Sequence, residues 1–316
     1  MGMGRKGGAT GIDAETRGLG WGFLGILGFS LTIPATRAAV PALGATFVGL
    51  GRAIVAALLA AALLVALRER PPARRHWPGL ATVALGVVLG FPLCTSLALA
   101  RLPAAHGAVV VGLLPAATAV MAVLRAGERP PRGFWVACIA GVAAVLAFAL
   151  AEGAGRPQVP DLLLLLAVAL AALGYAEGGR LARELGGWRV ICWALIVAAP
   201  VLVLPVSHSL PRHGLDAGLG PWLGFAYLSG VSMFLAFFAW YKGLALGGVA
   251  RVGQVQLLQP LLSLGWAAAL LGEHVGAGTV AAAGVVVASV AWGRRAGRST
   301  RSASAARPPA PSHFQG

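Results

Sequence analysis

The stretch VGQVQLLQPLLSLGWAAALLGE, from Val252 to Glu273, carries the strongest structural signal in the chain. Its apolar part has about the 20 residues that a helix needs to cross the hydrocarbon core of a bilayer. Gln256, Gln259 and Ser263 recur at i, i+3 and i+7, so they form one polar stripe on an otherwise apolar helix. The pattern predicts a membrane-spanning helix with one polar face.

A second stretch, 145 residues earlier, matches this one. An ungapped shift by 145 positions aligns Pro115 with Pro260 and Glu128 with Glu273, and a glycine precedes each glutamate. The same shift also aligns Leu99 with Leu244, Ala100 with Ala245, Ala105 with Ala250, Leu113 with Leu258 and Gly133 with Gly278. Alanine and leucine matches arise easily in such a composition, but the spacing from proline to Gly-Glu does not. We therefore predict an internal repeat.

The composition excludes a soluble chain. Of the 316 residues, 58% are hydrophobic and 11% are charged, whereas soluble domains are about 45–50% apolar and about 25% charged. The 3 cysteines lie far apart in apolar runs and form no disulfide framework. The net charge of +15 comes from short basic clusters between apolar runs, which is typical of membrane topology signals and not of nucleic-acid binding. An integral membrane protein remains.

Ten segments are long and apolar enough to span a bilayer, which predicts an all-α polytopic membrane protein. They are Leu19–Thr36, Leu43–Leu67, Pro78–Ala100, Ala104–Leu124, Gly133–Ala151, Leu162–Gly179, Val190–Val206, Pro221–Tyr241, Val252–Leu271 and Val275–Trp292.

Lysine and arginine are distributed unequally between alternate loops. Of the 25 basic residues, 20 lie on one predicted side, four on the other, and Arg52 lies inside the second span. The positive-inside rule places both termini of a multi-pass membrane protein in the cytoplasm.

The repeat divides the chain into two halves. We expect a cytoplasmic segment 1–18, five-helix repeats 19–151 and 152–293, and a disordered basic cytoplasmic tail 294–316. Five is an odd number, so the two halves would cross the membrane in opposite directions. Inverted repeats with interrupted helices are typical of secondary transporters, and a duplication kept in a structural protein is the alternative.

The ten spans, the five-plus-five repeat, the Trp21-Gly22 opening and the paired proline-to-Gly-Glu helix ends resemble the drug/metabolite transporter superfamily, EamA type. The resemblance covers Leu19 to Trp292. It implies a location in the plasma (inner) membrane and export or uptake of amino acids, metabolites or drugs across it, and it says little about the substrate. The link GERPPR after the fourth span is richer in arginine than its counterpart GEHVGAG, which we interpret as a topology signal.

Arg52 is the first candidate for solute binding. It lies about 9 residues, or about 13 Å of helix rise, into the second span, and a charge at that depth is costly and usually functional. Its planar guanidinium suits a carboxylate or phosphate. The alternative is an arginine bonded to carbonyl groups freed by Pro34 or Pro41.

Glu177 and Tyr175 lie near the cytoplasmic end of the sixth span. Glu177 is a candidate proton- or cation-coupling carboxylate, and an ion pair with Arg180 three residues later is the alternative. Tyr175 points elsewhere on the helix, as a solute contact or as an interfacial aromatic residue.

The polar stripe of the ninth span is the second candidate. Pro260 has no N–H to bond the Gln256 carbonyl, so that oxygen is free beside Gln259 and Ser263. Either these groups bind a polar solute or they pair with another helix. In the first half Pro115 and Thr118 occupy the corresponding place.

Prolines predict helix kinks at Pro34, Pro92, Pro115 and Pro260. Pro34 frees the Ser30 carbonyl, which Ser30 and Thr32 are expected to satisfy locally. Glu128 and Glu273 lie on opposite faces and are expected to make helix-end contacts. His106 and His274 are expected in water near the outer surface.

Other chemistry has no sequence support. The 2 lysines lie in no phosphate-binding loop, and no Cys/His spacing fits zinc or haem, so we expect no cofactor, no metal and no catalytic residue. We predict a secondary transporter, in the export direction, for a small polar or amphipathic metabolite or drug. A flippase for a lipid-linked substrate, a membrane-embedded enzyme and a scaffold are the alternatives. The expected partners are the solute and the lipid bilayer, and a homodimer is left open.

Overall fold

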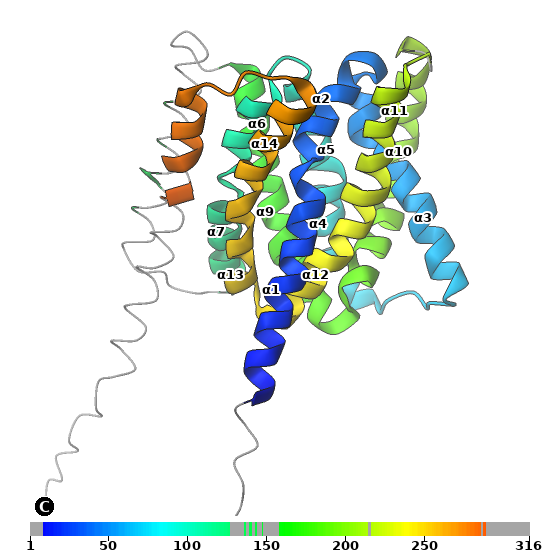
Figure 1. The fold of residues 1–316 in the computed structure, drawn as a ribbon. Coiled ribbons are helices and arrows are strands. Elements are labelled where there is room, and N and C mark those ends of the chain that lie inside the picture. Colours follow the sequence, from blue (N-terminus) through cyan, green and yellow to red (C-terminus); the bar gives the residue numbers. More distant parts are fainter. Residues whose placement is uncertain are drawn as a thin grey trace, which may run out of the picture.

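The computed structural model describes residues 9–126, 158–213 and 216–285, together with positions 136, 139–140, 143, 147 and 287–288. Throughout that part of the chain the regular structure is helical, and the helices form one bundle (Figure 1). In chain order they are α1 (Ala9–Ser30), α2 (Thr32–Leu43), η1 (Phe47–Gly51), α3 (Arg52–Ala66), η2 (Arg74–His76), α4 (Trp77–Val83), η3 (Ala84–Gly90), α5 (Phe91–Leu99), α6 (Ala104–Val111), α7 (Leu114–Ala126), α9 (Val159–Leu185), α10 (Gly187–His213), α11 (Leu219–Ala226), η4 (Tyr227–Leu235), α12 (Ala236–Gly247), α13 (Val249–Val252), η5 (Gly253–Leu258) and α14 (Gln259–Leu271).

Consecutive elements join into long apolar rods. Within the described residues 7 rods are long and apolar enough to cross a bilayer: Thr16–Leu43, Phe47–Ala66, Arg74–Leu99, Ala104–Met121, Val159–Leu185, Gly187–Ser209 and Leu219–Gly247. They coincide with predicted spans one to four and six to eight. An eighth apolar helix, Val255–Leu271, is shorter and coincides with the ninth predicted span. The chain is therefore a multi-pass membrane protein whose described part is all-helical.

The two remaining predicted spans fall largely outside the described residues. Of the fifth, Gly133–Ala151, only single positions are described. Of the tenth, Val275–Trp292, residues 277–285 are helical. Glu128 and the predicted segments 1–18 (up to residue 8) and 294–316 also lie outside the described part of the chain.

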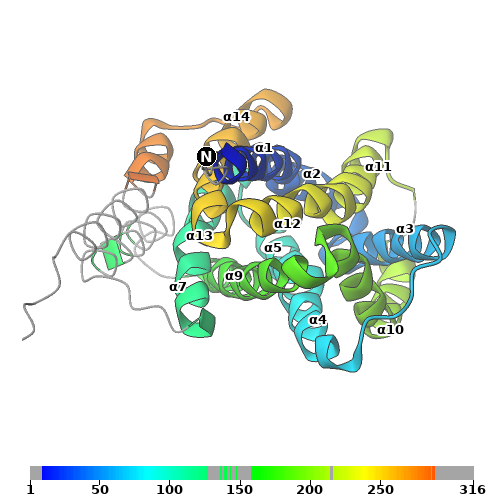
Figure 2. The ribbon, with the colours of Figure 1, turned by 90° about the horizontal axis from the view of Figure 1, so that it is seen from below.

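Small residues bring the helix backbones into direct contact. A Cβ atom on Gly243 of α12 would lie 2.6 Å from the backbone nitrogen of Gly22 in α1, and one on Gly18 would lie 2.6 Å from the nitrogen of Gly247. Close packing of this kind provides the attraction between helices in lipid, where no hydrophobic effect drives them together. Seen along the bundle, α5, α9 and α12 lie in the middle, and α3, α10 and α11 lie toward one side (Figure 2).

Several rods depart from α-helical geometry at mid-length. Wider π-helical turns form η1, η3 and η4, a tighter 3-10 helix forms η5, and single turns interrupt the chain at Leu31 and at residues 112–113. Four of these departures end two or three residues before Pro34, Pro92, Pro115 and Pro260. Proline explains this placement because it lacks an N–H and clashes with the preceding turn.

The departures occur at matching positions of the two halves. The helices α5 and α12 begin at Phe91 and Ala236, α6 and α13 begin at Ala104 and Val249, and α7 and α14 begin at Leu114 and Gln259. Each pair of starting residues is separated by 145 positions, the shift that aligns the sequence.

The matched segments 104–126 and 249–271 run in opposite directions. Both carboxylate oxygens of Glu273, just after α14, accept hydrogen bonds of 2.9 Å from the backbone N–H groups of Ala104 and Ala105 at the start of α6. The beginning of α6 thus lies beside the end of α14, and the two helices pack side by side (Figure 1). The carboxylate also suits the positive end of the α6 dipole.

The prediction for His106 is wrong. Its side chain is buried, and Nε2 lies 2.7 Å from Oδ1 of Asp161 at the start of α9. His274 is exposed, as expected. The difference arises because the start of α9 covers the first turn of α6, a contact that the local sequence does not reveal.

Candidate functional site

A small cavity lies in the middle of the bundle, and both halves of the chain line it. Its wall consists of Phe29, Thr32, Arg52, Val87, Phe91, Ala171, Tyr175, Ser232, Met233, Phe237 and Gln259. The centre of a water molecule has about 20 Å³ of room there, which is enough for a single water.

The interruptions of the helices place polar groups at this cavity. Thr32, Arg52 and Gln259 are the first residues of α2, α3 and α14, and Phe91 is the first residue of α5. Ser232 lies in the π-helical η4. Short π-helical stretches in α-helices are frequent at functional sites, and here three of them, η1, η3 and η4, contribute to the wall or lead directly into it.

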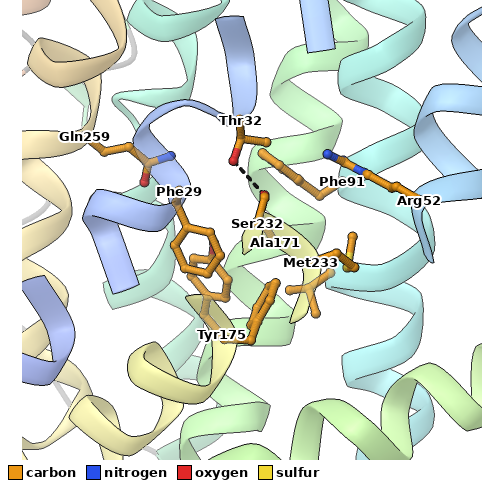
Figure 3. A pocket seen from close by; sticks show the side chains of 11 residues that line it. Phe29, Thr32, Arg52, Phe91, Ala171, Tyr175, Ser232, Met233 and Gln259 are labelled. Carbon is orange, nitrogen blue, oxygen red and sulfur yellow. Dashed lines mark hydrogen bonds between the residues drawn. The ribbon is translucent and has the colours of Figure 1, made fainter. Parts of the chain in front are cut away.

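Arg52 is a buried cation with no counter-ion among the described side chains. Its side chain is 1% exposed, and none of its three guanidinium nitrogens has a hydrogen-bond partner among the described residues. Figure 3 shows it extending into the site from the side opposite Gln259. The alternative interpretation, that carbonyls freed by Pro34 or Pro41 bind it, is therefore wrong for this conformation.

The acidic side chains at positions 69, 161, 177, 184, 216 and 273 are engaged elsewhere or lie on the surface. Asp216 is exposed. The bonded pairs are Glu69 with Arg189, Asp161 with His106, Glu177 with Arg180, Glu184 with His76, and Glu273 with the N–H groups of Ala104 and Ala105.

Hydroxyl and amide groups complete the polar part of the wall. The hydroxyls of Thr32 and Ser232 are 2.7 Å apart and join the two halves across the cavity (Figure 3). The amide oxygen of Gln259 is buried and has no partner in the described structure. Gln256 is also buried, and neither its amide oxygen nor its amide nitrogen is bonded to a described group, but it does not line the cavity.

Aromatic rings form the other wall. The ring centroids of Phe29 and Phe237 are 4.8 Å apart, and that of Tyr175 lies 6.1 Å from Phe237 and 5.5 Å from Trp240. Tyr175 is 4% exposed, so its alternative interpretation as an interfacial aromatic residue is wrong. The arrangement offers one buried positive charge, a few free polar atoms and an apolar wall of aromatic rings.

Ser263 is occupied by an interhelical hydrogen bond. Its hydroxyl donates to the carbonyl oxygen of Ser30 at 2.7 Å, and the indole N–H of Trp266 donates to the Ser30 hydroxyl at 3.0 Å. The Ser30 carbonyl is the one that Pro34 frees, and it is satisfied by another helix and not locally as predicted. Ser263 thus pairs with another helix and does not line the cavity.

Two other predicted site residues lie away from the cavity. The Thr118 hydroxyl donates to the Leu114 carbonyl oxygen at 2.7 Å, inside its own helix. Glu177 Oε1 accepts a hydrogen bond of 2.6 Å from Arg180, so the structure forms the ion pair that was the alternative to a coupling role.

Ser232 was missed in the sequence. Ser229 and Ser232 lie three residues apart in the apolar stretch YLSGVSMF and therefore share a helix face. The same polar-stripe criterion that singled out the ninth span would have found them. Among the described residues, no three His, Cys, Asp or Glu side chains gather as a metal site.

Comparisons with known proteins agree with this architecture. The EamA-like transporter family model matches residues 16–150 and again 158–292. The chain is 46% identical over 279 residues to the "Uncharacterized transporter YdeK" of Bacillus subtilis (strain 168), which covers 87% of this chain and 97% of that protein. A solved structure described only as the crystal structure of a protein superposes with a TM-score of 0.64 at 20% identity, over 90% of this chain and 99% of that one. At this identity the superposition shows a shared fold.

Proposed function

Because the chain belongs to the EamA-like transporter family, which makes it a membrane transporter and not an enzyme, we propose that it is a secondary transporter. It moves a small polar or amphipathic metabolite or drug by alternating access, without hydrolysing ATP. We propose export across the plasma membrane as its direction.

The observation that carries this proposal is the position of the cavity. Arg52 comes from the first family match, and Gln259 and Tyr175 come from the second, yet all three line one space. A buried polar site between two related units is the arrangement that allows access to alternate from one side of the membrane to the other.

The proposal includes ten spans in two inverted halves, 19–151 and 152–293. The two family matches begin and end close to these bounds. The 145-residue offset of three pairs of helix starts and the opposite directions of α6 and α14 support the inversion. The excess of basic residues in alternate loops supports cytoplasmic termini.

The interrupted helices are the proposed moving parts. In the rods that carry Thr32, Arg52, Ser232 and Gln259, the interruption lies at the cavity itself. A helix bends at such an interruption at lower cost than elsewhere, because the regular hydrogen-bond ladder is already broken there. The cavity, which has room for one water in this conformation, would widen when these helices bend.

We propose that Arg52, Gln259 and Tyr175 contact the solute, with Gln256 reaching it when the bundle opens. Ser263 and Thr118 are assigned to helix packing because of their backbone hydrogen bonds. Glu177 is assigned to the ion pair with Arg180.

The test begins with an untargeted metabolite comparison between cells with and without the protein. Each metabolite that changes is then offered to proteoliposomes containing the purified full chain. We expect protein-dependent transport of at least one of them, and a loss of about 10- to 100-fold for Arg52→Gln, as for a hydrogen bond to a charged group. Arg183→Gln, at an exposed position of α9, should transport normally. Absence of movement for every candidate, or full transport by Arg52→Gln, would contradict the proposal.

A further inference from the structure

We propose that the solute is a small organic anion whose carboxylate binds Arg52 and whose apolar or aromatic body packs against Phe29, Tyr175 and Phe237. This inference rests on the proposed function, because it concerns the same cavity. It adds the charge and the chemical class of the solute.

The first argument is the missing counter-ion. Arg52 is 1% exposed, and its Nε, Nη1 and Nη2 atoms have no partner in the described part of the protein. Asp161, Glu177 and Glu273 are each bonded to another group. Glu69 and Glu184 are paired elsewhere and Asp216 is exposed. A buried charge without a partner is strongly unfavourable. A solute of opposite charge that binds from solution would therefore supply the charge pairing that the described protein groups do not.

The second argument is the absence of negative charge at the described cavity wall. None of the wall residues is acidic. A solute ammonium group would find no carboxylate there and would lie close to Arg52, which repels it. A cation is therefore excluded by the same charge that attracts an anion, and a zwitterion would lose part of what it gains.

The backbone does not change this balance. Four wall residues begin α-helices, where the helix dipole is positive. At Arg52, Phe91 and Gln259, however, another helix (η1, η3 or η5) ends at the preceding residue. The negative end of that helix offsets the positive end of the helix that follows. The net charge of the described cavity wall is therefore the positive charge of Arg52.

The third argument concerns the body of the solute. Away from the guanidinium, the rings of Phe29, Tyr175 and Phe237 pack against one another with centroid separations of 4.8 to 6.2 Å and line the cavity. Contact with these rings stabilises a bound flat apolar group and stabilises a strongly hydrated ion very little. The free Gln259 amide oxygen accepts one hydrogen bond from the solute.

Matched probes test the charge directly. Benzoate, benzamide and benzamidine have nearly the same shape and carry a negative, no and a positive charge at pH 7. The same comparison is made for phenylacetate and 3-phenylpropionate with their amides and amines. The full chain in detergent is heated with each probe at constant ionic strength. At least one carboxylate should raise the midpoint of unfolding by about 2 °C at several times its Kd, while its amide has a smaller effect and its cation none. If no carboxylate exceeds its amide, the inference is overturned.

Variants locate the effect at Arg52. Without a probe, Arg52→Gln should unfold at the same or a higher temperature, because it removes an unpaired buried charge, and it should lose the carboxylate effect. Arg183→Gln should keep that effect. Arg52→Lys keeps the charge but loses the bidentate geometry, so it should retain a weaker carboxylate effect. A lower unfolding temperature of Arg52→Gln without probe, or equal stabilisation of Arg52→Lys by carboxylate and amide, contradicts the inference.

Transport measurements separate this inference from the proposed function. If proteoliposomes move the amides or amines and exclude the carboxylates, the chain is a transporter and the anion assignment is wrong. If carboxylates stabilise the protein through Arg52 and none of the probes or cellular metabolites crosses the vesicle membrane, the anion site stands and the transport function fails.

Discussion

The hydroxyl of Ser263 donates a hydrogen bond of 2.7 Å to the carbonyl oxygen of Ser30, a residue 233 positions earlier in the chain. This carbonyl lacks its helical partner because Pro34 has no N–H. The bond therefore satisfies a defect of the first rod with a side chain of α14. It connects the two halves next to the cavity that both of them line.

We expect Ser263→Ala to lower the free energy of unfolding by about 0.5–2 kcal/mol, the range measured for hydrogen bonds between membrane helices. The loss follows because the Ser30 carbonyl would be left without this donor at membrane depth. Denaturant titration of the purified protein measures it. Ser207→Ala, at an exposed serine bonded to its own helix, is the matched control. An unchanged stability of Ser263→Ala would mean that the hydroxyl is free to contact the solute.

Glu273 should matter for stability and not for the charge of the cavity. Its two carboxylate oxygens each accept an N–H at the start of α6, and loss of such a cap costs about 0.5–2 kcal/mol. We expect Glu273→Ala to lower the unfolding temperature and Glu273→Gln to lower it less, because one amide oxygen still accepts. Asp216→Asn, at an exposed position, should leave it unchanged. Equal stability of all three variants would refute the capping role.

The backbone contact between α1 and α12 predicts that one added methyl group strongly disturbs the packing of these helices. A Cβ on Gly243 would lie 2.6 Å from the Gly22 nitrogen, and backbone atoms cannot move aside as a flexible side chain does. Gly243→Ala should therefore yield little monodisperse protein in size-exclusion chromatography. Gly20→Ala, where nothing lies within 4 Å of the new Cβ, should purify normally. Normal behaviour of Gly243→Ala would show that the two helices pack less closely.

The ion pair between Glu69 and Arg189 predicts a pH dependence of stability. Glu69 lies in the loop after α3, and the 2.6 Å hydrogen bond from Arg189 lowers the pKa of Glu69 below its usual 4.5. A carboxylate with a lowered folded-state pKa stabilises the protein above its unfolded-state pKa, and this contribution is lost as the pH falls through the folded-state value. Stability of the parent protein should thus fall below about pH 4.5 more steeply than that of Glu69→Gln. Parallel pH profiles of the two proteins would contradict this assignment.

Local patterns predicted much of the architecture. Seven of the ten predicted spans coincide with long apolar rods of the structure, because hydropathy summed over about 20 residues depends only on neighbouring residues. The helix interruptions before Pro34, Pro92, Pro115 and Pro260 follow from proline itself. Arg52 could be singled out because a charge in an apolar run is conspicuous whatever surrounds it.

The sequence by itself thus determined the class of protein, the positions of most spans, the repeat and the position of Arg52 inside an apolar span. The tertiary structure alone decided the partner of each polar group. Ser263 faces Ser30, Tyr175 faces the cavity, Glu177 turns to Arg180, and His106 is covered by Asp161. The physical reason is that hydropathy and helical periodicity act between residues near in sequence, whereas the partner of a polar side chain in a bundle depends on how distant helices rotate and cross, which only their mutual packing establishes.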